Sequence, residues 1–267
     1  MGEAIVITSG KGGVGKTTTT ANLGTALALL GKRVCLVDTD IGLRNLDVVM
    51  GLENRIIYDL VDVAEGRCTV QKALVKDKRF DDKLYLLPAA QTSDKTAVTP
   101  EQMKLLVGEL KQDYDYVLID CPAGIEQGYK NAVAGADQAI VVTTPEVSAV
   151  RDADRIIGLL EKEEHVKRPR LVINRIRSHM VKSGDMLDID EIVMHLSIDL
   201  LGIIADDENV IKASNNGEPI VLDPTSKASI AYRNIARRIL GESVPLQQLE
   251  DEQKGVFSKL KKFFGVR

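Results

Sequence analysis

The stretch that decides the fold reads Gly10-Lys11-Gly12-Gly13-Val14-Gly15-Lys16-Thr17 and matches the pattern G-x-x-x-x-G-K-[ST] at every fixed position. It follows a strand-like apolar run and precedes a helical pattern, which is the context of a phosphate-binding loop. Its glycines let backbone N–H groups turn toward phosphate oxygens, and the helix N-terminus adds positive potential. We therefore expect a nucleoside triphosphate here, with Lys16 on the β- and γ-phosphates and the Thr17 hydroxyl on Mg²⁺.

Outward from this loop, short apolar runs alternate with helical patterns along most of the 267 residues. Continuous apolar runs are typical of strands covered on both faces, as in a parallel sheet. The alternation predicts one doubly wound α/β domain of the P-loop NTPase type, with a mostly parallel sheet and helices on both faces. The expected strands are Ala4–Thr8, Arg33–Asp38, Leu84–Pro88, Tyr116–Asp120, Gln138–Thr143, Arg170–Asn174 and Leu201–Ala205. The expected helices are Lys16–Leu30, Pro100–Gln112, Ile125–Ala134, Ala149–Glu164, Asp188–Leu196 and Ser226–Leu240.

The composition argues against several classes of protein. A net charge of −4 makes the chain as a whole a poor ligand for nucleic acid. Cys35, Cys68 and Cys121 form no C-x-x-C pair, so neither a zinc ribbon nor a thioredoxin-like site is indicated. No signal peptide is expected, and no apolar run approaches the roughly 18 residues of a membrane span. We expect a cytoplasmic protein with reduced cysteines.

Two of the expected strands end in aspartate. Asp38 and Asp40 follow one apolar run, and Asp120 ends another. Ligands of open α/β sheets bind at this carboxyl edge. An apolar run that ends in aspartate is the pattern of the carboxylate that holds Mg²⁺ directly or through water. Asp120 is therefore the expected metal ligand beside Thr17, and Asp38 is a second candidate whose alternative role is to cap the strand end.

The C-terminal residues differ in composition from the rest. We expect an ATPase domain over 1–241, an acidic linker over 242–254 and an amphipathic helix over 255–267. On a helical wheel five apolar side chains fall within an arc of about 120° and three lysines fall outside it. A short basic helix rich in Phe predicts an anchor on an anionic membrane surface; a helix packed on the domain or a disordered tail is the alternative. The apolar residues are Val256, Phe257, Leu260, Phe263 and Phe264, and the lysines are Lys259, Lys261 and Lys262.

Lys11 distinguishes this loop from an ordinary phosphate-binding loop. A lysine near the start of the loop defines the deviant Walker A ATPases, and the chain resembles this ParA/MinD family along its length. The resemblance implies a homodimer that forms with ATP bound, in which Lys11 reaches the nucleotide of the partner; a solvated loop lysine is the alternative. Further stretches that carry the resemblance are Asp40–Asp47, Glu146–Arg155 and Ala213–Pro219.

The resemblance also implies a catalytic set. It suggests slow, Mg²⁺-dependent hydrolysis of ATP to ADP, stimulated by a partner. Lys11, Lys16 and Asp40 would be catalytic, with Asp40 positioning the attacking water. The residues expected to bind the nucleotide are Gly10, Lys11, Gly12, Gly13, Val14, Gly15, Lys16, Thr17, Thr18, Asn174, Arg175, Asp206 and Asp207.

Recognition of the adenine base is the least defined part of that set. Asn174 and Arg175 resemble the residues that read the base in this family. Asp206 and Asp207 would close its other side. Ala205 stands where many relatives carry proline, which leaves the base contacts of this loop open.

The quoted stretches most resemble the branch of the family that selects the division site. This branch implies a switch that binds the inner face of the cell membrane as an ATP-bound dimer and positions a division inhibitor of the MinC type. The helix carrying Arg151, Asp152 and Asp154 would contact that inhibitor, and the stimulating partner is not identified. The alternatives are a ParA-type ATPase that partitions DNA or cargo, a flagellar-number regulator, and a metal-cluster scaffold. No specific nucleic acid is expected.

Overall fold

The structure is a computed structural model that describes residues 1–246. The predicted amphipathic helix over 255–267 and the linker beyond Leu246 lie outside the described residues. None of the described helices is long and apolar enough to cross a membrane.

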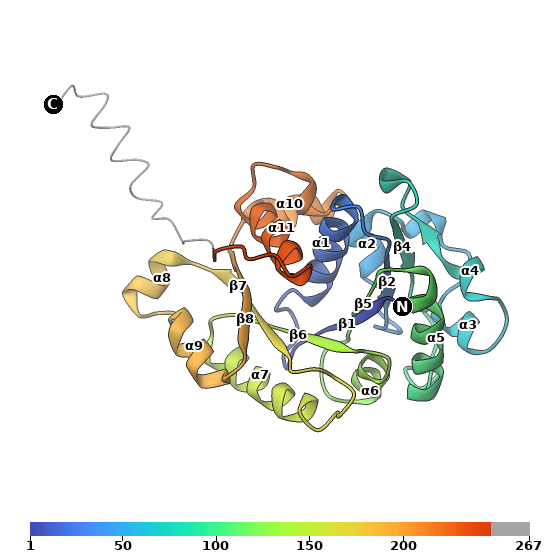
Figure 1. Ribbon diagram of the computed structural model, residues 1–267, viewed down its shortest axis with the longest axis horizontal. Coiled ribbons are helices and arrows are strands. Elements are labelled where there is room, and N and C mark those ends of the chain that lie inside the picture. The colour runs from blue at the N-terminus through green and yellow to red at the C-terminus, as the bar shows by residue number, and fades with distance from the viewer. Residues whose placement is uncertain (247–267) are drawn as a thin grey trace.

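The described residues form an eight-stranded sheet in the order β3-β4-β2-β5-β1-β6-β7-β8 (Figure 1). Neighbouring strands in it are parallel except for the β3–β4 pair. The prediction of a mostly parallel doubly wound sheet is therefore confirmed. The strands are β1 (Glu3–Thr8), β2 (Val34–Asp38), β3 (Val75–Lys76), β4 (Leu84–Leu87), β5 (Tyr116–Asp120), β6 (Gln138–Thr143), β7 (Arg170–Ile176) and β8 (Asp199–Ala205).

Helices cover both faces of the sheet, with α1 and α11 on one face and α5, α6 and α7 on the other (Figure 1). The long ones lie where periodicity predicts them. The short helices α2, α3, α4, α8 and α10 were not predicted, because a few residues do not repeat an apolar period often enough to be recognised. The helices are α1 (Lys16–Leu29), α2 (Leu46–Met50), α3 (Leu60–Ala64), α4 (Val70–Ala73), α5 (Pro100–Asp113), α6 (Gln127–Ala134), α7 (Val147–Leu160), α8 (Ser178–Ser183), α9 (Ile189–Leu196), α10 (Glu208–Asn215) and α11 (Lys227–Ile239).

One predicted boundary is wrong, because α7 ends at Leu160 and not at Glu164. The N–H of Glu163 bonds to the carbonyl of Leu160 three residues back, which tightens the chain into a turn. Leu160 is also the last buried apolar residue of the helix. Residues 161–164 are all charged, so no burial supports another helical turn.

The core divides into two clusters, one on each side of the sheet. In β1, Ala4 and Val6 pack into one cluster and Ile5 and Ile7 into the other, and all four are fully buried. Successive strand residues point to opposite faces, so a sheet between two helical layers buries both sets. The resulting rigid strands hold their carboxyl ends, and the loops that follow, in fixed register.

Cys35 and Cys121 lie within this core as free thiols. Burial raises the pKa of both thiols, that of Cys121 to about 12, so both stay protonated at neutral pH. A protonated buried thiol is a poor nucleophile. These cysteines therefore act as small core residues, as the sequence predicts.

Candidate nucleotide-binding site

The phosphate-binding loop joins the carboxyl end of β1 to α1, as predicted. Gly13 and Gly15 have φ values of +79° and +100°, which glycine adopts without strain. A Cβ atom on Gly15 would lie 2.4 Å from Nδ2 of Asn174, so this position also needs glycine for space. A loop with left-handed residues next to a helix N-terminus forms a concave anion site, so the backbone fits a polyphosphate.

Lys16 is the buried cation of this loop. Only 7% of it is exposed, and its ammonium donates to Oγ of Ser9 over 2.9 Å. Ser9 in turn donates to the carbonyl of Lys11 over 2.7 Å. Ser9 thus holds both lysines of the motif, one by its side chain and one by its backbone. Ser9 was not predicted, because its one signal in the sequence is a hydroxyl directly before the loop.

Lys11 lies exposed at the rim of the site. Its ammonium donates to Oγ of Ser148, near the start of α7, over 3.0 Å. The backbones of the loop and α7 also touch, since a Cβ atom on Gly10 would lie 2.0 Å from the carbonyl oxygen of Asp152. Lys11 is therefore held on its own protomer, and its predicted contact with a partner's nucleotide stays a prediction.

Asp120 and Thr17 lie together, as the metal prediction requires. The carboxylate of Asp120 accepts a hydrogen bond from the Thr20 hydroxyl over 3.2 Å, and the Thr17 side chain lies close enough to lower the pKa of Asp120. Asp120 is 2% exposed at the end of β5. A carboxylate and a hydroxyl form a set of hard oxygen ligands that suits Mg²⁺ beside phosphate oxygens. This pair therefore fits the expected ion.

Asp38 is fully buried and holds the loop that follows β2. Its Oδ1 accepts the N–H of Asp40 over 2.9 Å and its Oδ2 accepts the N–H of Leu46 over 3.2 Å. Both oxygens thus organise the segment that carries Asp40, which matches the capping alternative. The metal contact of Asp38 stays a prediction.

Two buried carboxylates face each other at this edge, because Asp38 on β2 pairs in register with Asp120 on β5. Burial and the charge of Asp120 raise the pKa of Asp38 to about 8. Burial raises the pKa of Asp120 to about 6, although Thr17, Lys16 and Thr20 oppose the shift. A bound cation favours the ionised form of both carboxyl groups, so their placement is a second reason why Mg²⁺ fits here.

Asp40 is only partly buried, at the mouth of the site. Burial raises the pKa of its carboxyl, and the charges of Lys95 and Lys16 oppose that shift. A carboxylate that stays accessible beside Lys16 suits the predicted role of orienting a water molecule.

Asn174 ends a buried stretch of β7 against the phosphate-binding loop. Its Nδ2 donates to the carbonyl of Val14 over 2.8 Å, and its Oδ1 accepts the N–H of Arg175 over 2.9 Å. The amide therefore braces the loop, a role that the sequence did not indicate. Arg175 is exposed and has a φ of 56°.

The two aspartates predicted on the other side of the base have different surroundings. Asp206 forms an ion pair with Arg177 over 2.6 Å. Asp207 is the N-cap of α10, and its carboxylate also accepts a hydrogen bond from Ser226 over 2.7 Å. Asp207 is thus a structural cap, and the base contacts of both residues stay predictions.

The stretch Ala213–Pro219 contains a close backbone contact. Gly217 and Gly51 both have a φ of +66°, and a Cβ atom on Gly217 would lie 2.6 Å from Cα of Gly51. Arg79 bonds to the carbonyls of Met50 and Gly217 over 2.6 and 3.2 Å. The helix that follows the Asp40 loop is therefore fixed against the segment that follows α10.

The predicted partner-binding residues lie on α7, where Arg151 and Asp154 are exposed and Asp152 is partly buried. The predicted membrane-binding residues lie outside the described residues. They are Val256, Phe257, Lys259, Leu260, Lys261, Lys262, Phe263 and Phe264.

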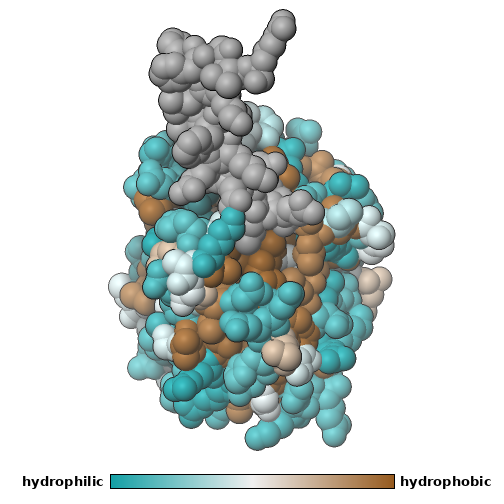
Figure 2. All heavy atoms as spheres, turned by 90° about the vertical axis from the view of Figure 1, so that its left-hand side faces the viewer, coloured by the Kyte–Doolittle hydropathy of each residue, from teal (hydrophilic) through white to brown (hydrophobic). Residues whose placement is uncertain are grey.

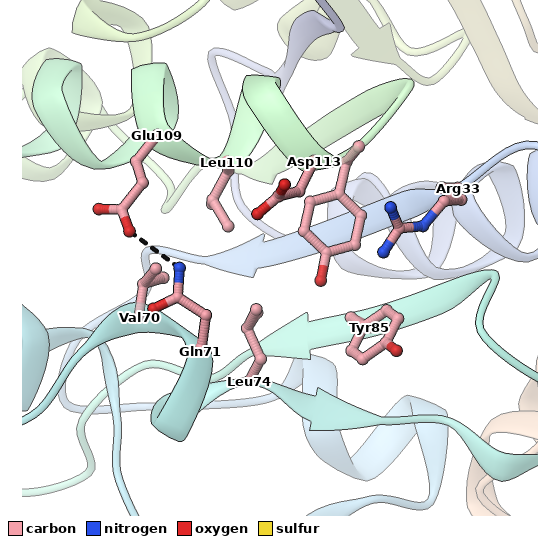
Figure 3. Close-up of a pocket in the computed structure, with 9 residues that line it drawn as sticks. Arg33, Val70, Gln71, Leu74, Tyr85, Glu109, Leu110 and Asp113 are labelled. Carbon is pink, nitrogen blue, oxygen red and sulfur yellow. Dashed lines mark hydrogen bonds between the residues drawn. The ribbon is translucent and has the colours of Figure 1, made fainter.

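A cavity of about 250 Å³ lies elsewhere, between α4, α5 and β4 (Figure 3). The rings of Tyr85 and Tyr114 meet edge to face at 5.4 Å, and the guanidinium of Arg33 lies 5.3 Å from the centre of the Tyr114 ring. The cavity is at the amino ends of β2 and β5, whereas the phosphate-binding loop is at the carboxyl end of the sheet. It therefore has no part in the nucleotide site.

Known proteins share both this sequence and this fold. Residues 5–220 match the CobQ/CobB/MinD/ParA nucleotide binding domain family. The septum site-determining protein MinD of Bacillus subtilis is 81% identical over 267 residues, which is all of both chains. The MinC:MinD cell division protein complex of Aquifex aeolicus contains a chain that is 52% identical, with a TM-score of 0.86 over 93% of this chain and 100% of that one.

A more distant structure bears on the ligands. The septum site-determining protein MinD of Pyrococcus horikoshii, complexed with Mg-ADP, is 31% identical, with a TM-score of 0.81 over 90% of this chain and 96% of that one. The similarity therefore extends over the whole phosphate-binding fold described above. This chain belongs to the MinD group of septum site-determining proteins, within the CobQ/CobB/MinD/ParA nucleotide-binding family.

Proposed function

We propose that the protein is a Mg²⁺-dependent ATPase that dimerises with ATP, binds the inner face of the cytoplasmic membrane and positions a division inhibitor. One observation carries the proposal: the buried Lys16, the Thr17–Asp120 pair and the accessible Asp40 converge on one phosphate-binding loop whose rim carries the exposed Lys11. This arrangement binds phosphate inside one protomer and leaves a cation at the surface.

Each residue has a distinct part in hydrolysis. The loop N–H groups and Lys16, whose ammonium also donates to Ser9, bind the phosphates. Thr17 and Asp120 would hold Mg²⁺, which supplies positive charge next to the phosphate oxygens. Asp40 orients the attacking water, on a segment that Asp38 holds through two backbone N–H groups. Asn174 supports the loop from behind through the carbonyl of Val14.

Lys11 is suited to act on a second protomer. It is exposed, and within residues 1–246 its ammonium donates a hydrogen bond to Ser148. Breaking an exposed hydrogen bond costs about 1 kcal/mol or less. A triphosphate of the partner is a stronger acceptor for an ammonium group, so the residue can change partners when ATP joins two copies.

The membrane step rests on the sequence of the C-terminal segment. Burial of its five apolar side chains contributes on the order of 7–15 kcal/mol at the full-transfer limit. Three lysines on anionic lipid add about 1 kcal/mol each, and ordering the segment costs on the order of 1 kcal/mol per residue. One segment therefore binds weakly, and two segments on a dimer bind much more tightly through effective concentration.

The inhibitor assignment follows from the relatives. The Aquifex aeolicus chain was solved as a MinC:MinD complex. In this chain Arg151 and Asp154 are exposed on α7, where a protein partner can reach them. We propose a MinC-type protein as the partner of this surface.

Co-sedimentation with anionic vesicles, with ATP, ADP or no nucleotide, tests the proposal. Wild type should sediment with ATP when hydrolysis is slow, and Lys11→Ala should lose both this binding and the ATP-dependent dimer measured by light scattering. Equal binding with every nucleotide would contradict the switch. Binding to nonspecific DNA with ATP, and not to vesicles, would favour the partitioning alternative.

A further inference from the structure

The described chain leaves the domain at the edge of the sheet, close to β8. β8 is the last strand in the sheet order, so one of its edges has no neighbouring strand among residues 1–246. Figure 2 faces the side of the molecule that carries α8 and α9 and shows a strip of apolar side chains between hydrophilic ones. The segment after α11 runs along this part of the molecule and ends, within the described residues, at Leu246.

Arg238, near the end of α11, binds that segment to β8. Its Nε donates to the carbonyl of Val244 over 2.9 Å and its Nη2 to that of Pro245 over 2.6 Å. Its Nη1 donates to the carbonyl of Leu201 on β8 over 2.9 Å. One guanidinium thus joins three backbone carbonyls from two segments. Lysine cannot do this, because its single ammonium lacks the planar array of donors.

The strand is shaped to receive this side chain. Leu200 and Gly202 pair with consecutive residues of β7, so Leu201 is the extra residue of a bulge and has no partner in the ladder. Its carbonyl is the one that Arg238 takes. A Cβ atom on Gly202 would lie 2.4 Å from Cγ1 of Ile235, so glycine is what lets α11 approach this closely.

We propose that Arg238 is a positioning residue that fixes where the C-terminal segment 247–267 leaves the domain. The inference rests on the proposed function, in which that segment binds lipid. With the chain held at Pro245, nine linker residues precede the amphipathic segment at residue 255, and without the hold thirteen do, counted from Glu242. Effective concentration falls as about the −3/2 power of tether length. Loss of the Arg238 bonds should therefore weaken membrane binding by the two C-terminal segments of a dimer roughly twofold.

Arg238→Gln removes the hold, and Arg237→Gln is the matched control. Arg237 is the adjacent arginine and pairs with Glu242, but it does not contact the carbonyls of Val244 or Pro245. Both variants lose one positive charge at the same place. Neither residue belongs to the nucleotide site, so the basal ATPase rate should equal that of wild type in both.

Limited proteolysis with chymotrypsin measures directly whether Arg238 keeps residues 244–246 on the domain. Cleavage after Leu246, which is 45% exposed, should be roughly tenfold faster in Arg238→Gln than in Arg237→Gln, because three hydrogen bonds to a charged group are lost. Arg238→Lys should fall in between. Equal cleavage rates in all the variants would overturn the hold, whatever the protein does on membranes.

Vesicle binding measures the effect of the Arg238 bonds on membrane affinity. With ATP, Arg238→Gln should need about twice as much anionic lipid for half-binding as Arg237→Gln. Deleting the uncharged residues Gln247–Leu249 from Arg238→Gln shortens the tether again and should restore most of the loss, which a general structural defect would not allow. If Arg238→Gln were cleaved faster by chymotrypsin but bound vesicles as well as Arg237→Gln does, the positioning role would be overturned. Failure of wild type to bind vesicles with ATP would contradict the proposed function. The cleavage rates would still show whether Arg238 holds the chain at Val244 and Pro245.

Discussion

Charged side chains are arranged differently at the two ends of the sheet. At the amino end, Asp137 pairs with Lys111 over 2.6 Å and accepts the N–H of Ala4, and Glu3 pairs with Lys167 over 2.8 Å. At the carboxyl end, Asp38 and Asp120 face each other in the interior. One sheet therefore carries paired charges at its amino end, beside β1 and β6, and opposed carboxylates at its carboxyl end, on β2 and β5.

The pKa shifts show what this difference means. Although burial opposes it, hydrogen bonds from Lys167 and Gln138 lower the pKa of Glu3. Burial raises the pKa of Asp38 and Asp120 instead. Paired charges stabilise the fold, whereas the opposed carboxylates destabilise the nucleotide-free protein until a cation joins them. The amino end is thus structural and the carboxyl end is built to bind a ligand.

The largest expected difference between the two ends concerns their lysines. Lys16→Ala should lower the ATPase rate by at least about a hundredfold, because a buried cation on the phosphates is lost. Lys167→Ala should leave the rate unchanged, since Lys167 pairs with Glu3 at the surface of the other end. Steady-state ATPase assays of the two variants check this. A lower ATPase rate in Lys167→Ala would contradict the view that the amino end of the sheet is purely structural.

Two aspartates give a matched pair with a smaller expected loss. Asp120→Asn should lower Mg²⁺-dependent hydrolysis by about ten- to a hundredfold with little loss of stability, because it also removes a buried like charge. Asp137→Asn should keep the rate but lower the free energy of unfolding by about 1–3 kcal/mol, since Lys111 loses its partner. Kinetics and urea denaturation of both variants separate the two effects.

The stability of the nucleotide-free protein should depend on pH in a specific direction. The pKa of Asp38 rises from 3.8 to about 8 on folding. The folded chain therefore binds more protons than the unfolded chain between about pH 4 and pH 8, and stability falls as pH rises through this window. Urea denaturation in EDTA should show this fall, and Asp120→Asn should make it shallower, since burial still raises the pKa of Asp38 when the charge of Asp120 is gone. A free energy of unfolding that rises steadily across the window would contradict the opposed pair.

The smallest effect should come from Ser148. Ser148→Ala removes the acceptor that holds the Lys11 ammonium on its own protomer. Because that bond is exposed, its loss should tighten the ATP-dependent dimer by no more than about fivefold. Sedimentation equilibrium with ATP and Mg²⁺ measures the change, and Lys167→Ala at the amino end of the sheet is a control. A weaker dimer in Ser148→Ala would mean that the contact supports assembly.

Local patterns were sufficient for the fold and for the phosphate-binding loop. The eight residues of the loop are contiguous, and their spacing alone imposes the turn before α1. Apolar runs bounded by turns were enough to place every strand but β3, whose two residues carry too little pattern. Aspartates at strand ends could be assigned to one edge because parallel strands end together.

Contacts between distant residues could not be foreseen. Asp38 and Asp120 are 82 positions apart, and their register across β2 and β5 makes them a buried pair. The bracing of the loop by Asn174, the hold of Lys11 by Ser148 and the bond from Arg238 to Leu201 likewise join separate elements. Periodicity reports which face of an element is buried, but not which side chain meets it there, because that depends on how the elements pack.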